Sequence, residues 1–147
     1  MPKFAFVFPG QGSQAVGMLN GFAGNAVVQE TVAEASDALG FDLDKLIAEG
    51  PKEELDLTTN TQPVMLTSSV AFYRAWIAAG GAVPEVIAGH SLGEFSALVA
   101  AGVIPFADAV KLVRFRAQAM QEAVPVGVGG MAAIIGLDSD SLKTACQ

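Results

Sequence analysis

A serine between two glycines marks the point where a short apolar segment gives way to a helical pattern. The segment Val86 to Gly89 follows Pro84 and is typical of a buried strand, whereas the Leu- and Ala-rich run from Leu92 is typical of a helix. The junction reads Gly89-His90-Ser91-Leu92-Gly93, which is the pattern G-x-S-x-G. In such a turn, side chains at the two glycines would clash with neighbouring backbone. The sequence therefore predicts a sharp strand-to-helix turn with Ser91 at its apex.

This position favours nucleophilic chemistry at Ser91. Its hydroxyl would stand at the carboxyl end of a strand and at the start of a helix. Unpaired backbone N–H groups and the positive end of the helix dipole favour a developing oxyanion there. The alternative is an inert serine that caps the helix N-terminus. The pattern alone leaves both interpretations open.

His90 is the sole histidine, and it directly precedes the candidate nucleophile. Adjacent residues in a tight turn point in different directions, so His90 is poorly placed to accept the proton of Ser91. We expect His90 to be a packing or orienting group. A nucleophilic Ser91 then has no histidine base within these residues.

The apolar run Phe4 to Phe8 predicts a first strand that is covered on both faces in a parallel sheet. The loop after it, from Pro9 to Gln14, contains Gly10-x-Gly12-x-x-Ala15, which resembles a dinucleotide-binding fingerprint. That fingerprint requires a second strand ending in an acid about twenty residues later. Asp37 instead falls within a helical pattern, which argues against nucleotide binding. The remaining prediction is that this loop supplies a second backbone donor of an oxyanion hole.

Apolar spacing and capping signals predict the helices. Gly40 closes the first, and Pro63 lies in the first turn of a central helix that is packed on two sides. Gln62, at the start of that helix, is either a capping residue or a site residue. We expect Pro51 to Asp56 to be a solvated turn without chemistry. The expected helices are 27–39, 42–49, 61–79, 105–124 and one that begins at Ser139, with a strand at 131–135.

The helix 105–124 carries one basic residue on its inward edge. Arg116 falls in a row of small and apolar residues, whereas Lys111 and Arg114 fall on the polar side. A guanidinium in that row needs a partner, and its planar fork suits a carboxylate. A structural salt bridge or a snorkelling side chain is the alternative.

Charge and cysteine content exclude several classes of function. The net charge of −7 and the eight scattered Lys and Arg residues argue against a nucleic-acid binder. Cys146 is the single cysteine, which excludes a disulfide framework, a Cys-based metal site and a redox pair. The sequence shows neither a signal peptide nor an apolar stretch long enough for a bilayer. We therefore expect a cytoplasmic protein without a membrane partner.

Four motifs occur in a fixed order along the chain: Phe6 to Gln14, Thr61-Gln62-Pro63, Gly89 to Glu94, and Arg116. Together they resemble one enzyme family, the malonyl-CoA:acyl-carrier-protein transacylases of bacterial fatty-acid synthesis. The resemblance implies that Ser91 is the acylated nucleophile and that Arg116 binds the malonyl carboxylate. It also implies an oxyanion hole from the backbone N–H groups of Gln11 and Leu92, and a site shaped by Gln62 and His90. The resemblance implies that malonyl-CoA and holo-acyl carrier protein are the partners and that the protein is a monomer. It implies no cofactor and no metal.

The resemblance also implies a fold. Family members have an α/β-hydrolase-like large domain with a parallel sheet and a nucleophile elbow, and an inserted ferredoxin-like small domain. Residues 1–126 would belong to the first and 127–147 to the first strand and helix of the second. Members are about twice this long and carry their catalytic histidine further downstream. We therefore expect an N-terminal part of such an enzyme that is inactive alone.

Three functions remain open at this point. The first is malonyl transfer through an acyl-serine intermediate. The second is a serine hydrolase or thioesterase with the same elbow, in which a cation for a free carboxylate would have no use. The third is an inactive N-terminal fragment.

Overall fold

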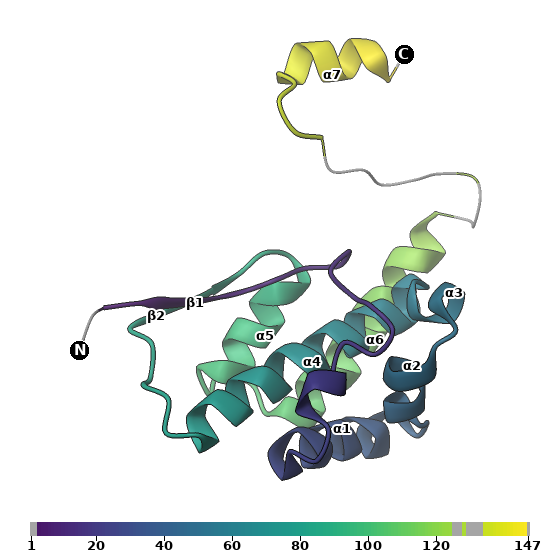
Figure 1. Cartoon of the computed structure of the whole chain (residues 1–147). Coiled ribbons are helices and arrows are strands. Elements are labelled where there is room, and N and C mark those ends of the chain that lie inside the picture. Colours follow the sequence, from purple (N-terminus) through teal and green to yellow (C-terminus); the bar gives the residue numbers. More distant parts are fainter. Residues whose placement is uncertain (1–2, 125–127, 129–133, 147) are drawn as a thin grey trace.

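The computed structural model describes residues 3–124, 128 and 134–146 and shows an α/β arrangement of helices on a small parallel sheet (Figure 1). The two strands are β1 (Ala5–Phe8) and β2 (Val86–Gly89), and a short 3-10 helix, η1, spans Asn20–Phe22. The α-helices are α1 (Ala26–Leu39), α2 (Leu43–Glu49), α3 (Lys52–Leu55), α4 (Thr58–Ala78), α5 (Leu92–Ala100), α6 (Phe106–Ala123) and α7 (Ser139–Ala145).

The strands β1 and β2 pair in parallel, with Ala5 opposite Val86 and Phe8 opposite Gly89. Aromatic rings on one side of β1 pack against α4: the ring centroid of Phe6 lies 5.5 Å from that of Tyr73 and 5.8 Å from that of Trp76. The other side of β1 is open. We expected a strand covered on both faces, and this was wrong for the part of the chain that the structure describes, since Val7 is 73% exposed.

The central helix is α4, which packs against α1, α5 and α6 (Figure 1). Every residue from Thr61 to Ala71 is buried, which explains why this stretch has no single apolar face. The prediction of a central helix is confirmed. The core around α4 includes Val32, Leu43, Ile47, Leu55, Val64, Leu66, Val70, Leu92, Val110 and Val113.

The first turn of α4 differs from the prediction. The helix begins at Thr58, about one turn before the expected start, so Pro63 lies inside the helix rather than in its first turn. The residue before the helix, Leu57, has no side chain that caps a backbone N–H. Nothing in the local sequence therefore marked this boundary.

Capping residues delimit several other helices. Gly40 ends α1 in the left-handed conformation, with φ of 74°, as expected. Asp42 caps α2 by accepting from the N–H of Lys45. The segment Pro51 to Asp56, predicted as a solvated turn, instead forms α3, and its Leu55 is completely buried in the core.

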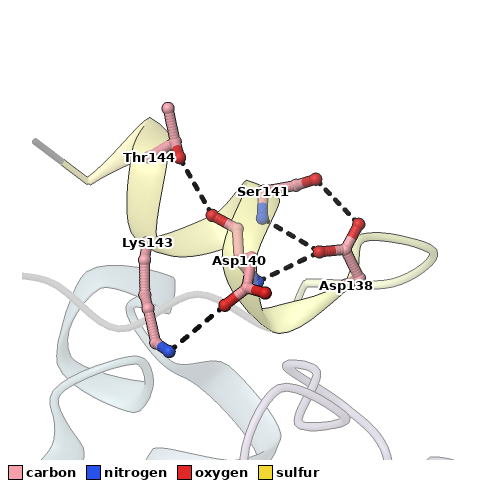
Figure 2. A network of polar contacts seen from close by, with 5 residues as sticks. All are labelled: Asp138, Asp140, Ser141, Lys143 and Thr144. Atoms are coloured by element: carbon pink, nitrogen blue, oxygen red, sulfur yellow. Dashed lines mark hydrogen bonds and ion pairs between the residues drawn. The ribbon is translucent and has the colours of Figure 1, made fainter.

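The helix α7 is capped by Asp138, which accepts from the backbone N–H groups of Asp140 and Ser141 and from the Ser141 hydroxyl (Figure 2). These bonds, the Ser141 N–H first, hold the pKa of Asp138 below its ordinary value. The predicted helix from Ser139 is confirmed. Of the strand predicted at 131–135, residues 131–133 lie outside the described residues.

Candidate active site

The turn around Ser91 has the backbone of a nucleophile elbow. Ser91 has φ of 54° and ψ of −110°. In the described part of the chain, it is the only non-glycine residue with a positive φ. L-residues rarely adopt such a conformation unless the surrounding structure imposes it. A Cβ on Gly89 would lie 1.9 Å from the carbonyl oxygen of Gly93, and a Cβ on Gly93 would lie 2.2 Å from that of Phe8. The predicted need for both glycines is confirmed.

The side chain of Ser91 does not cap the helix that follows it. Its hydroxyl oxygen accepts no capping hydrogen bond from a backbone N–H of α5. Instead the exposed Oγ accepts a hydrogen bond of 2.9 Å from Nη2 of Arg116. The inert capping interpretation is therefore wrong, and the hydroxyl is presented away from the helix as expected of an elbow.

Strand register brings two loops to the same edge of the sheet. Because Phe8 pairs with Gly89, the loop after β1 and the elbow after β2 leave the sheet side by side (Figure 1). Within the described residues, the backbone N–H groups of Gln11 and Leu92 donate to no protein acceptor. Both groups are therefore available to an oxyanion. The N–H of Leu92 is at the start of α5, where backbone N–H groups have no partner within the helix.

His90 lies at the same edge but does not contact the hydroxyl of Ser91 as a base. A Cβ on Gly10 would lie 3.2 Å from the backbone oxygen of His90 and 3.8 Å from its Nδ1, so the imidazole is next to the β1 loop. No hydrogen bond joins the ring to Ser91 in the part of the chain that the structure describes. This placement agrees with the expectation of a packing or orienting group.

Arg116 connects the elbow to the central helix. Its Nη2 contacts Ser91, and its Nη1 donates to Oε1 of Gln62 at 2.7 Å. Gln62 is completely buried, and its Nε2 contacts the Sδ of Met120 at 3.3 Å. Among the residues described, no ion pair joins a carboxylate to Arg116, so the salt-bridge alternative finds no support there. The structure thus brings together three residues predicted from distant parts of the sequence.

Arg114 is a second inward-facing arginine, which the sequence analysis placed on the polar side of α6. Its Nη1 donates to the carbonyl oxygen of Thr59 at 2.6 Å and to Oδ1 of Asn60 at 2.7 Å. A helical N–H four residues after Thr59 would normally take that carbonyl, but residue 63 is a proline and has none. Arg114 therefore supplies the donor that Pro63 lacks, and α6 holds α4 through both arginines. The sequence analysis missed this role of Arg114 because it placed Pro63 in the first turn of the helix, where a missing N–H leaves no carbonyl without a donor.

Polar contacts also fasten the loop after β1. The Gln14 side chain accepts from the N–H of Gly12 at 2.8 Å and donates to Asp56 at 2.8 Å. Hydrogen bonds from Lys52, first, and from Gln14 hold the pKa of Asp56 below its ordinary value. Gln11 donates from its side chain to the Thr58 hydroxyl at 3.3 Å. The segment that we expected to carry no chemistry therefore anchors a loop of the site.

Among the residues that the structure describes, no group of three or more His, Cys, Asp or Glu side chains is placed to hold a metal ion. No helix of the described ranges has the length and apolar character that crossing a membrane requires.

This geometry agrees with the match of the chain to a known protein family. The acyl transferase domain matches residues 5–147, nearly the whole chain. The chain belongs to the acyl transferase domain family. A serine in a strained turn beside backbone donors is what acyl transfer through a covalent intermediate requires.

Relatives within the acyl transferase family are closely similar to this chain. The malonyl CoA-acyl carrier protein transacylase of Salmonella typhimurium is 62% identical over 148 residues, which cover 100% of this chain and 48% of the relative. An acyl-carrier-protein S-malonyltransferase from Burkholderia pseudomallei has a crystal structure with 72% identity and a TM-score of 0.90, covering 99% of this chain and 47% of that protein. The chain spans about half the length of the curated relatives it matches.

A further solved structure contains a partner. It is a malonyl-transacylase in complex with its type II PKS acyl-carrier protein in the holo form. It is 56% identical to this chain, with a TM-score of 0.91, and the match covers 99% of this chain and 47% of that one.

Proposed function

We propose that the protein transfers a malonyl group from malonyl-CoA to the phosphopantetheine thiol of an acyl carrier protein, through an acyl intermediate on Ser91. The observation that carries the proposal is the hydrogen bond of 2.9 Å from Arg116 Nη2 to Ser91 Oγ. It places a cation without a carboxylate partner, among the described residues, directly beside the hydroxyl. A simple thioesterase has no use for that cation, whereas an acyl group with a second carboxylate does.

In the first half-reaction, Ser91 Oγ attacks the thioester carbonyl of malonyl-CoA. The N–H groups of Gln11 and Leu92 would stabilise the oxyanion, and collapse of the tetrahedral intermediate breaks the carbon–sulfur bond. Coenzyme A leaves as the thiol after receiving the proton that Ser91 has lost. In the second half-reaction, the phosphopantetheine thiol attacks the ester carbon and Ser91 regains its proton. Each step exchanges an acyl group between oxygen and sulfur and therefore needs no metal or redox cofactor.

Arg116 would orient the substrate through its carboxylate. Gln62 holds Nη1 at 2.7 Å, which leaves Nη2 to exchange Ser91 Oγ for the stronger carboxylate acceptor. This exchange also releases a lone pair of Ser91 for reaction. His90 and Gln62 would shape the site without accepting the proton of Ser91. We propose that the base belongs to a segment outside the described residues, since none of those residues accepts from this hydroxyl.

We further propose that the complete architecture is an α/β-hydrolase-like large domain with a ferredoxin-like small domain. Residues 1–126 would belong to the large domain and 127–147 to the small one. The parallel pairing of β1 with β2 and the elbow before α5 support the first assignment. The helix α7, which is capped by Asp138, supports the assignment of residues 127–147 to the small domain, because a helix is expected there.

A labelling experiment tests the proposed intermediate. The native protein is incubated with malonyl-CoA, and the modified peptide is mapped by mass spectrometry. We expect a malonyl adduct on Ser91 that disappears in Ser91→Ala. Ser96→Ala is the matched control, because Ser96 is a buried serine of α5, the helix that follows Ser91, and this variant should keep the adduct. An adduct at another residue, or one that persists in Ser91→Ala, would refute the proposal.

A further inference from the structure

The amide of Gln62 is held at both ends by one helix. Its Oε1 accepts from Arg116 Nη1 at 2.7 Å, and its Nε2 meets the Sδ of Met120 at 3.3 Å. Gln62 is completely buried, so water does not compete for either end. Arg116 and Met120 are four residues apart on α6 and therefore project from the same side of that helix.

The two partners accept only one orientation of the amide. The Arg116 guanidinium is donor-only, so it requires the oxygen end of Gln62. A thioether sulfur is a weak acceptor and has no hydrogen to donate, so Met120 requires the NH₂ end. A half-turn of the amide would place donor against donor at Arg116 and would leave two buried groups unpaired.

We propose that Met120 is a positioning residue that sets the acyl specificity of the site by fixing the Gln62 amide. This inference rests on the proposed function. Met120 holds the NH₂ group, the amide then presents Oε1 to Arg116, and Arg116 keeps Nη2 directed at Ser91 and the substrate carboxylate. Without the sulfur, the amide loses its only partner on the nitrogen side within the described residues. The guanidinium is then less well ordered for malonyl, whereas an acyl group without a second carboxylate is unaffected.

Met120→Leu tests the proposal because leucine keeps the volume of methionine but has no acceptor. The readout is the ratio of kcat/KM for malonyl-CoA to that for acetyl-CoA, measured with the native protein. We expect Met120→Leu to lower this ratio about three- to tenfold, the range that one hydrogen bond supports. Met65→Leu is the matched control, since Met65 is a buried methionine of α4 that belongs to the core. Its ratio should not change.

A double-mutant cycle separates positioning from packing. In a Gln62→Leu background, Met120→Leu should have no further effect on the ratio, because Met120 acts through the amide. A ratio unchanged by Met120→Leu, an equal loss for both acyl groups, or the same loss in the Gln62→Leu background would each overturn the inference.

A spectroscopic readout keeps this inference distinct from the proposed function. The side-chain ¹⁵N–¹H₂ resonances of Gln62 should shift in Met120→Leu and not in Met65→Leu, whatever reaction the protein catalyses. Unshifted resonances would refute the role of Met120. If the native protein transferred no malonyl group and these resonances still shifted in Met120→Leu, the proposed function would be refuted, while the contact of Met120 with the Gln62 amide would stand.

Discussion

Nη2 of Arg116 on α6 donates a hydrogen bond of 2.9 Å to Oγ of Ser91, which lies 25 positions earlier in the turn between β2 and α5. A guanidinium donates and does not accept, so it occupies a lone pair of the serine oxygen and cannot take its proton. The same cation that would bind the substrate therefore covers the nucleophile until a better acceptor arrives. This relationship ties acyl selectivity to the readiness of Ser91.

Replacing Arg116 should discriminate between acyl groups. We expect Arg116→Ala to lower kcat/KM for malonyl-CoA about 10- to 100-fold, because a hydrogen bond to a charged group contributes about 1.5–3 kcal/mol. Acetyl transfer should not fall, because an acetyl group has no carboxylate for Arg116 to bind. Steady-state kinetics with both thioesters checks this, with Lys111→Ala as a control on the exposed side of α6. Equal losses for the two substrates would favour a structural role for Arg116.

A methyl group at Gly93 should disrupt the elbow. A Cβ there would lie 2.2 Å from the backbone oxygen of Phe8, which has no freedom to move within β1. We expect Gly93→Ala to lower the free energy of unfolding by about 3 kcal/mol or more, since overpacked backbone relaxes poorly. Urea unfolding measures this. Gly21→Ala, where a Cβ meets nothing within 4 Å, is the control, and equal stability of the two variants would contradict the prediction.

Pro63 and Arg114 should be energetically coupled. Arg114→Leu leaves the Thr59 carbonyl without its donor, and Thr59 is half-buried, so we expect a loss of about 1 kcal/mol in unfolding free energy. In a Pro63→Ala background, the new N–H of residue 63 can bond that carbonyl, and the loss should fall by half or more. Denaturant unfolding of both single variants and the double variant gives the coupling. Strict additivity would show that Arg114 does not replace the missing N–H.

Acid should release the loop after β1. The pKa of Asp56 is below its ordinary 3.8 because Lys52 and Gln14 hydrogen-bond its carboxylate. Its stabilising contribution is therefore fully present above pH 3.8 and is lost as the pH falls through the lower pKa of the folded state. The side-chain amide resonance of Gln14 should titrate with a midpoint below 3.8 and should not titrate in Asp56→Asn. A midpoint at or above that value would contradict the prediction.

The elbow was predictable because its constraints are local. A close approach at Gly89 and Gly93 leaves no room for side chains, and this is visible in five consecutive residues. The cap at Gly40 was predictable for a similar reason, because the left-handed conformation favours glycine. The approach of Gln62 and Arg116 to Ser91 was expected from the family resemblance. Their residue types alone also allowed a capping residue and a salt bridge.

The remaining features depend on tertiary contacts that have no local signal. Periodicity placed Arg114 on the polar side of α6, yet a carbonyl left free by Pro63 draws it to α4. The apolar run of β1 predicted cover on both faces, but hydropathy does not specify which element lies on each face of a sheet.

The pairing of Phe8 with Gly89 couples the geometry of the site to the packing of the sheet. Its two proposed oxyanion donors are main-chain groups, so substitutions at their side chains leave them in place. A slip of one residue between the strands would shift the two donors relative to each other by about 3.3 Å. It would also turn the side chain of Phe8 from the core to the opposite face of the sheet. Such a variant would lose core packing and fail to fold, whatever the effect of the slip on the reaction. Selection on folding alone therefore preserves much of the geometry that the reaction needs.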